Sequence, residues 1–202
     1  HRKQASIHKI TRFIDKCYAG PLLKKEIDAI NLVIKNKKEP VTCIIGGSKI
    51  STKINVITSL IEKINNLIIV GAMANNFFIY NNYSIGKSLV ENNTGKIIKN
   101  IYEQAKKNNC EIIIPEDCMV GTSFEGKGKN KNLKKIKEKE IILDIGLKKK
   151  KKIRQIIDQS NTVLWNGPAG YFENENFQNG TLSIAETISK NTNKNSLISV
   201  LG

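Results

Sequence analysis

The sequence is poor in the residues from which metal sites, disulfides and membrane spans are built. Its 202 residues include two histidines and only four cysteines: Cys17, Cys43, Cys110 and Cys118. The cysteines form no CxxC pair and have no nearby histidine, which excludes a zinc site of the usual spacing. We therefore expect reduced, structural thiols in a cytoplasmic protein. No apolar run approaches the length of a membrane span, and no signal peptide is visible.

Two common phosphate-binding motifs are also missing. There is no GxxxxGK[ST], because Asn81 occupies the position where the stretch IGKSL (85–89) would need its first glycine. There is no GxGxxG either. The motifs alone therefore give a generic nucleotide loop little support.

Acidic residues are scarce beside basic ones. The chain has 18 Asp and Glu against 33 Lys and Arg, for a formal net charge of +15. Such an excess is typical of proteins that bind nucleic acid or anionic membranes, so a basic α/β nucleic-acid-binding domain is the alternative interpretation. Against this alternative, the sequence lacks interleaved aromatic residues and any known nucleic-acid-binding motif. We expect the densest run, Lys148 to Lys152, to form a solvated face.

Short apolar runs and helical patterns alternate along the chain. Five runs are apolar throughout, as strands buried on both faces should be: 42–45, 67–70, 112–114, 162–165 and 197–201. Between them, isoleucines and leucines recur every three or four residues, which predicts helices over 22–34, 50–64 and 97–105. This order predicts a doubly wound, Rossmann-like α/β fold with a parallel sheet and helices on both sides.

Two segments and both ends depart from this rhythm. Residues 121–135 are polar, basic and rich in glycine, so we expect an exposed excursion such as a hairpin. Residues 1–20 carry Ile7, Ile10, Phe13 and Ile14, which predict a helix that either lies outside the sheet domain or connects it to another domain. The chain starts with His1 rather than Met and stops on the apolar stretch SLISVLG. We therefore expect a fragment of a longer protein, with its sheet truncated at the C-terminal edge.

Three glycine-bearing turns directly follow predicted strands: GGSK (46–49), VGAMANN (70–76) and WNGPAGYFE (165–173). Ligands bind beyond the carboxyl ends of open parallel sheets, where glycine lets backbone N–H groups approach an anion. Lys49 and Lys53 lie four residues apart and could hold phosphate. Structural turns without a ligand would leave the same pattern, and Glu173 could equally be a solvated loop acid.

Five stretches, in order, resemble the phosphoglycerate kinase family. They are CIIGGSKISTKI (43–54), NLIIVGAMANNFF (66–78), YSIGKSLVE (83–91), ILDIG (142–146) and TVLWNGPAGYFENENFQNGT (162–181). HRKQAS (1–6) resembles the stretch that precedes this family's connecting helix. The resemblance covers nearly the whole chain and implies two lobes, with residues 1–20 ending the amino lobe and 21–202 forming an incomplete nucleotide-binding lobe. The amino lobe that holds the phosphoglycerate would be missing.

The resemblance implies reversible phosphoryl transfer in glycolysis between 1,3-bisphosphoglycerate and ADP, which gives 3-phosphoglycerate and ATP. It implies magnesium as the cofactor, with its aspartate outside this fragment, and a cytoplasmic monomer with no nucleic-acid or membrane partner. The fragment alone is expected to be inactive. The departures from the family pattern are Val70 and Ala72 in place of two glycines, and the lysine run after ILDIG.

The resemblance also assigns roles to single residues. Lys49 would steady the transferring phosphoryl group, and Arg2, beside His1, would hold the substrate phosphate. The remaining assigned residues would bind the nucleotide: Gly47, Ser48, Lys53, Gly71, Gly146, Asn166, Gly167, Pro168 and Glu173.

Overall fold

The computed structural model describes residues 9–35, 37–195 and 197–202. The chain divides into two compact units, one ending at residue 36 and one spanning residues 37–202. In the described part of the first unit, the 3-10 helix η2 (Ile10–Arg12) and the helix α1 (Pro21–Lys35) are joined by irregular chain. Of the helix expected within 1–20, the structure describes only the end: η2 stops before Phe13, which is 86% exposed, and residues 1–8 lie outside the described part. The lobe boundary after residue 20 stays a prediction.

The second unit contains two sheets and six helices among its described residues. Its elements in chain order are β1 (Val41–Ile45), α2 (Ile54–Ile61), β2 (Asn66–Ile69), α3 (Met73–Tyr80), α4 (Gly95–Lys107), β3 (Glu111–Ile113), β4 (Asp117–Gly121), β5 (Lys129–Asn132), the 3-10 helix η3 (Leu133–Lys135), β6 (Ile141–Ile145), α5 (Leu147–Asp158), β7 (Thr162–Asn166), α6 (Asn179–Asn195) and β8 (Ile198–Leu201).

The larger sheet has five strands in the order β3-β2-β1-β7-β8, and every neighbouring pair is parallel. This confirms the predicted α/β class. From β1 the chain first builds outward through β2 to β3, and later returns to place β7 against the other side of β1. The direction of winding therefore reverses between β1 and β7, which is where open α/β sheets bind their ligands.

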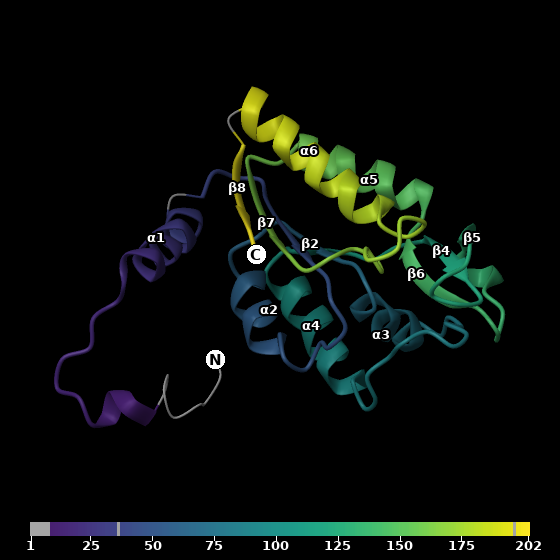
Figure 1. Ribbon diagram of the computed structural model, residues 1–202, viewed down its shortest axis with the longest axis horizontal. Coiled ribbons are helices and arrows are strands. Elements are labelled where there is room, and N and C mark those ends of the chain that lie inside the picture. Colours follow the sequence, from purple (N-terminus) through teal and green to yellow (C-terminus); the bar gives the residue numbers. More distant parts are fainter. Residues whose placement is uncertain (1–8, 36, 196) are drawn as a thin grey trace. The chain divides into compact units, whose positions relative to one another are not determined.

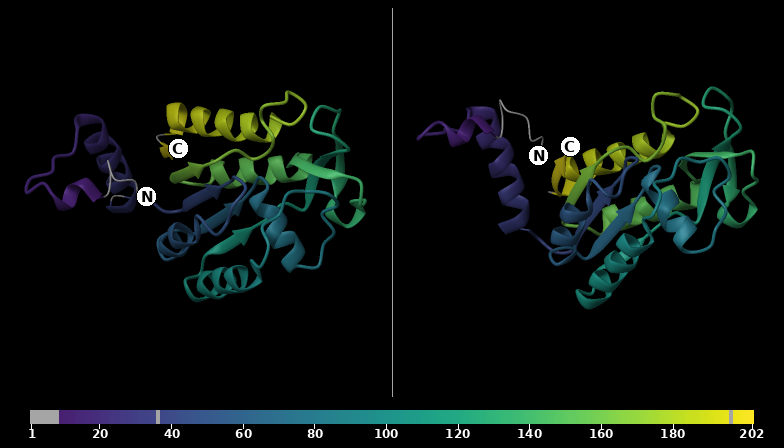
Figure 2. Two further views of the ribbon diagram at one scale, coloured as in Figure 1. Left: turned by 60° about the horizontal axis from the view of Figure 1, so that its bottom comes forward. Right: turned by 90° about the horizontal axis from the view of Figure 1, so that it is seen from below.

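Helices cover both faces of this sheet, with α5 and α6 on one side and α2 and α4 on the other (Figures 1 and 2). The two apolar cores follow the alternation of strand residues. Cys43 and Ile45 pack with Ile57 of α2, whereas Ile44 packs with Ile153 of α5 on the opposite face. In the described parts of the chain, no helix is both long enough and apolar enough to cross a bilayer.

A second, antiparallel sheet of order β5-β4-β6 lies beside the parallel one (Figure 1). Strands β4 and β5 pair across the loop 122–128, so a hairpin is confirmed, but its first strand begins at Asp117, ahead of the expected range 121–135. The expected solvated face at 148–152 is wrong for one residue, because Lys149 is only 2% exposed. Asp117 accepts hydrogen bonds from the backbone N–H groups of Lys148 and Lys149, and this fixes the first turn of α5 against β4.

The helix α2 starts at Ile54, four residues later than the isoleucine pattern from Ile50 predicts. Residues 51–53 form a turn instead, and Ile50 is fully buried ahead of the helix. The spacing of the apolar residues thus predicts correctly that Ile50 is buried, although the helix begins only at Ile54. As a result, Lys49 and Lys53 lie in the turn region before the helix.

Candidate functional site

The three glycine-bearing turns meet at the carboxyl ends of β1, β2 and β7. The N–H of Gly46 donates to the carbonyl oxygen of Asn166 at 2.8 Å, and the N–H of Gly71 donates to that of Ala169 at 3.0 Å. The N–H of Met73 donates to the carbonyl oxygen of Gly47 at 2.7 Å. Each turn is thereby hydrogen-bonded to another, so their backbones form one cluster.

Glycine is required in this cluster because the turns approach so closely. A Cβ atom on Gly46 would lie 2.1 Å from the carbonyl oxygen of Pro168, and one on Gly167 would lie 2.8 Å from the carbonyl carbon of Gly46. Gly47, Gly71 and Gly167 also have positive φ angles of 105°, 65° and 85°. The close packing of the turns therefore explains these glycines without a ligand. This structural role is compatible with a ligand at the same place.

Lys53 links the first turn to the third. Its ammonium group donates to the carbonyl oxygen of Gly46 at 2.9 Å and to Oδ1 of Asn166 at 2.5 Å. Burial lowers the pKa of Lys53, while the nearby Cys43 acts in the opposite direction. On the third turn, the indole N–H of Trp165 donates to the carbonyl oxygen of Gly167 at 2.7 Å and fixes the bend.

Lys49 lies in different surroundings from Lys53. It is exposed, and its charge reaches the carboxylate of Glu91. Hydrogen bonds from Ser51 lower the pKa of Glu91, and the charge of Lys49 adds to that effect. The contact of both ammonium groups with one anion therefore stays a prediction.

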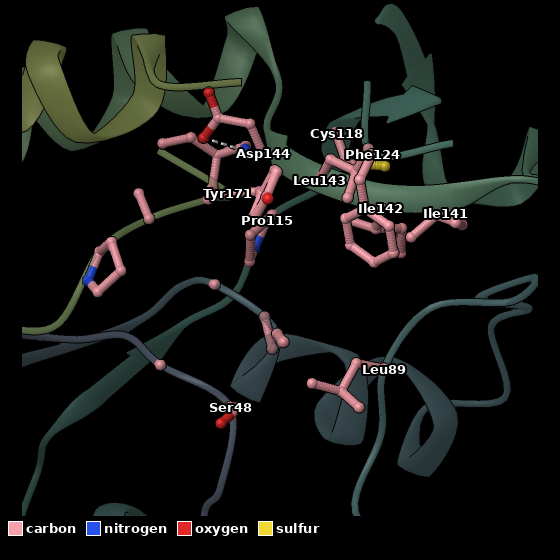
Figure 3. A pocket seen from close by; sticks show the side chains of 18 of the residues that line it. Ser48, Leu89, Pro115, Cys118, Phe124, Ile141, Ile142, Leu143, Asp144 and Tyr171 are labelled. Atoms are coloured by element: carbon pink, nitrogen blue, oxygen red, sulfur yellow. Dashed lines mark hydrogen bonds between the residues drawn. The ribbon is translucent and has the colours of Figure 1, made fainter. Parts of the chain in front are cut away.

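A cavity of about 350 Å³ opens beside the turn cluster. Figure 3 shows Ser48 and Leu89 on one side of it and Leu143 and Ile142 of β6 on the other. The cavity is thus lined by the turns of the parallel sheet and by the antiparallel sheet. Residues from all three turns contribute: Gly47, Ser48, Gly71, Ala72, Pro168, Ala169, Gly170, Tyr171 and Glu173.

Most of the remaining wall is apolar, and sequence reasoning missed it. The additional lining residues include Phe78, Leu89, Phe124, Ile141, Ile142 and Leu143. Phe124, from the β4–β5 loop, meets Tyr171 edge to face with ring centroids 5.2 Å apart. The side-chain N–H of Asn174 donates to the carbonyl oxygen of Phe124 at 2.8 Å, which holds this loop against the third turn. A flat apolar group fits such a wall.

Asp144 is the buried carboxylate of the cavity, and it also organises α6. Its Oδ2 accepts the N–H of Gly180 at 2.7 Å in the first turn of that helix, and its Oδ1 accepts the N–H of Ile145 at 2.8 Å. Burial raises the pKa of Asp144 to about 6 against the opposing effect of these hydrogen bonds. Glu173 also lines the cavity, but its side chain is exposed to solvent.

The structure brings five of the predicted site residues into the cavity wall: Gly47, Ser48, Gly71, Pro168 and Glu173. Lys53, Asn166 and Gly167 belong to the turn cluster behind it. Gly146 does not line the cavity, because it is the N-cap of α5 and a Cβ atom there would lie 2.2 Å from the carboxyl carbon of Asp117. Arg2 and His1 lie outside the described residues.

The cysteines are free, as expected. Cys43, Cys110 and Cys118 are buried, whereas Cys17 is exposed. Burial raises the pKa of Cys43 and of Cys118 to about 12 each and that of Cys110 to about 11, so these thiols stay protonated and unreactive at neutral pH. Over residues 9–35, 37–195 and 197–202, no group of three His, Cys, Asp or Glu side chains is placed to hold a metal ion.

Comparisons with known proteins settle the family to which this fold and site belong. The family model described as phosphoglycerate kinase matches residues 1–202, the whole chain. The chain belongs to the phosphoglycerate kinase family. The phosphoglycerate kinase of Wolbachia pipientis wMel is 41% identical over 203 residues, and that of Bartonella bacilliformis is 36% identical over 204 residues. Both alignments cover all of this chain and 51% of the relative.

Solved structures of the phosphoglycerate kinase family agree. The phosphoglycerate kinase from Coxiella burnetii superimposes with a TM-score of 0.88 at 34% identity, over all of this chain and 52% of that chain. The enzyme from Pyrococcus horikoshii OT3, at 24% identity and a TM-score of 0.71, is similar in fold. The chain thus spans about half the length of the phosphoglycerate kinases that it matches.

Proposed function

We propose that this chain is the nucleotide-binding half of a phosphoglycerate kinase, and that the whole protein transfers a phosphoryl group between 1,3-bisphosphoglycerate and ADP. The observation that carries the proposal is the meeting of three glycine turns at the reversal point of the sheet, beside a largely apolar cavity. A purine fits an apolar slot of this kind, and its phosphates would extend toward the backbone N–H groups of the turns.

In this proposal the turn cluster orients the phosphates. The ammonium group of Lys53 has three N–H donors, and two already hold Gly46 and Asn166. Its remaining donor is thus directed from a fixed position toward a phosphate. Lys49 is exposed and free to turn toward the transferring group, whose spreading negative charge a nearby cation would stabilise.

The other predicted residues support the nucleotide around this centre. Glu173, on the cavity wall, would accept hydrogen bonds from the ribose hydroxyls, and Gly71 would let the purine approach the backbone. Gly146 would act through the start of α5, and Arg2 would reach the substrate phosphate from the amino lobe. Ala72 lines the same wall, so its methyl group would narrow the space for the base.

The resemblance also implies magnesium bound with ADP or ATP. The described residues do not fit such a site on their own, so we assign none of them to the metal and derive no step through it. The proposed setting is a cytoplasmic, monomeric enzyme whose partners are the nucleotide, the phosphoglycerates and its own amino lobe.

The test is a coupled assay of phosphoglycerate-dependent ATP consumption by the full-length gene product. We expect clear turnover, and we expect Lys49→Ala to reduce kcat at least about a hundredfold, because one cation that contacts the transition state is worth a few kcal/mol. Lys151→Ala changes an exposed lysine of α5 that does not line the cavity, so it is the matched control and should turn over normally. Undiminished turnover of Lys49→Ala would remove our assignment of that residue.

The basic nucleic-acid-binding alternative accounts for the net charge but not for the three turns. Binding to random DNA that falls steeply with salt, and that is tighter than binding of ADP, is the result that would favour it.

A further inference from the structure

A second hollow, of about 450 Å³, lies along β3, an edge strand of the parallel sheet. Its walls come from β3 and the residues after it, from η3 and from α5. Three lysines line it, Lys134, Lys149 and Lys152, together with Glu111 and Glu116. The proposed phosphoryl transfer uses none of these five residues.

Lys149 is the charged group deepest in this lysine hollow. Its side chain is buried, and its ammonium group donates to the carbonyl oxygen of Ile114 at 2.5 Å. The backbone N–H of the same residue donates to Oδ1 of Asp117 at 3.0 Å, which fixes where α5 directs this side chain. An ammonium group has three N–H donors, so Lys149 retains capacity for a further acceptor.

The charged side chains of the hollow differ in how deeply they are buried. Glu111, Glu116, Lys134 and Lys152 are exposed, so water and salt screen them, whereas the charge of Lys149 is held in the interior. Among the described residues, the four ion pairs within 4.0 Å involve other lysines and an arginine, so no such pair neutralises these three lysines. Burial, together with the charge of Lys152, lowers the pKa of Lys149 to about 8, while the carboxylates of Glu116, Asp117 and Glu111 act in the opposite direction.

From this cavity and its lysine cluster we infer that the hollow binds a tetrahedral dianion, either inorganic phosphate or the phosphate group of a small metabolite. A phosphate group offers several acceptor oxygens, and charge-assisted hydrogen bonds to ammonium groups are the strong ones. An anion between Lys149 and Lys152 would also remove their mutual repulsion. Glu111 and Glu116 also line the hollow and are exposed, so with a phosphorylated metabolite they would face the uncharged remainder of the ligand.

The experiment is an NMR titration of the 202-residue chain, isotope-labelled at lysine, with inorganic phosphate and separately with glycerol 1-phosphate at pH 7. We expect saturable shifts of the Lys149 and Lys152 side-chain signals at millimolar ligand. Tighter binding of the ester would identify a phosphorylated metabolite as the ligand, and tighter binding of phosphate would identify the free ion. Both outcomes support the inference.

The same titration of variants tests the location. Lys149→Met and Lys152→Met should each bind about tenfold more weakly or worse, the effect expected for one lost charge-assisted hydrogen bond. Lys151→Met, on the same helix but outside the hollow, should bind normally. Because Lys152 is exposed, its variant keeps the test valid even if Lys149→Met folds poorly, which a thermal melt would reveal.

Three results would overturn the inference. One is the absence of saturable binding of either probe. Another is equal weakening in Lys151→Met and Lys152→Met, which would mean a diffuse charge effect. The last is a loss of binding confined to Lys49→Met, which would locate the anion at the turn cluster. Sulfate, whose charge is constant, should bind more weakly as the pH rises above 8, because Lys149 then loses its proton.

Discussion

At Gly46 the chain has no space for a single methyl group. The nearest obstacle is the carbonyl oxygen of Pro168. The turn that carries it cannot move aside freely, because the carbonyl oxygens of Asn166 and Ala169 on either side accept hydrogen bonds from Gly46 and Gly71. The turns can therefore meet only because residue 46 has no side chain. The stability that is lost when a methyl group is added there measures how rigidly the turns are joined.

We predict that Gly46→Ala lowers the free energy of unfolding by about 3 kcal/mol or more, because the new Cβ would clash with the backbone of Pro168. Chemical denaturation monitored by circular dichroism would measure it. The matched control is Gly95→Ala at the start of α4, where a Cβ atom meets nothing within 4 Å. That variant should lose nothing and gain up to about 1 kcal/mol from helix propensity. Equal effects of the two substitutions would contradict the proposed rigidity.

Lys149 should make stability depend on pH. Its folded-state pKa is lowered to about 8 from 10.5, chiefly by burial, and Lys152, Glu116, Asp117 and Glu111 surround it. Between these two pH values the unfolded chain binds the proton and the folded chain does not, so stability rises as the pH increases from 8 to 10.5.

The rise attributable to Lys149 is at most about 3 kcal/mol. Urea unfolding at pH 7, 8, 9 and 10 would measure it against Lys149→Met, which cannot titrate. Across this range the free energy of unfolding of the wild-type chain should rise relative to that of Lys149→Met. The same pH dependence in both proteins would show that the charge of Lys149 is not buried in solution.

At the scale of elements, carboxylates on neighbouring strands accept hydrogen bonds from the first turns of two helices. Asp117 of β4 accepts two N–H groups of α5, and Asp144 of β6 accepts one of α6. Both helices cover the same face of the parallel sheet (Figure 1). The antiparallel sheet thus fixes where these two helices start, which no local pattern in the helices themselves reveals.

We predict that Asp117→Ala destabilises the second unit by about 1–2 kcal/mol, because the first turn of α5 loses its acceptors. Asp117→Asn retains one acceptor oxygen and should lose less. Thermal melting of both variants beside the wild type gives the comparison. Hydrogen exchange at Lys148 and Lys149 should accelerate in the alanine variant, and unchanged exchange there would argue against the capping role.

The sequence was most informative for the parallel sheet. Its five strands lie within about a residue of their predicted ranges, because strands between two layers of helices are largely apolar and stand out as short runs. It was least informative for α5, whose five consecutive lysines obscured the buried stripe of Ile153 and Ile157. The turns of the site were predicted from their glycines. Its apolar wall was not, since Phe124 of the β4–β5 loop and Leu143 of β6 meet the turns only in the folded chain.

At the scale of the molecule, the chain spans about half of its relatives, and the cavity is one side of the proposed reaction site. The 202-residue chain alone should therefore bind ADP weakly and should not turn over, because the lobe proposed to hold the phosphoglycerate and to exclude water around the reacting groups matches the part of the relatives that the chain does not span. Calorimetry with ADP and the coupled assay on the purified chain check both statements. Clear turnover by the chain alone would refute them.

The hydrogen bonds among the three turns have a consequence for inheritance. Each turn depends for its conformation on hydrogen bonds to another turn. A recombinant protein that takes GGSK from one relative and WNGPAGYFE from a distant one would therefore combine turns that do not fit each other. Such chimeras should survive when the bends travel together and fail when they are split. The segments near residues 46, 71 and 167 are thus expected to evolve as one unit, although more than a hundred residues separate the first from the last.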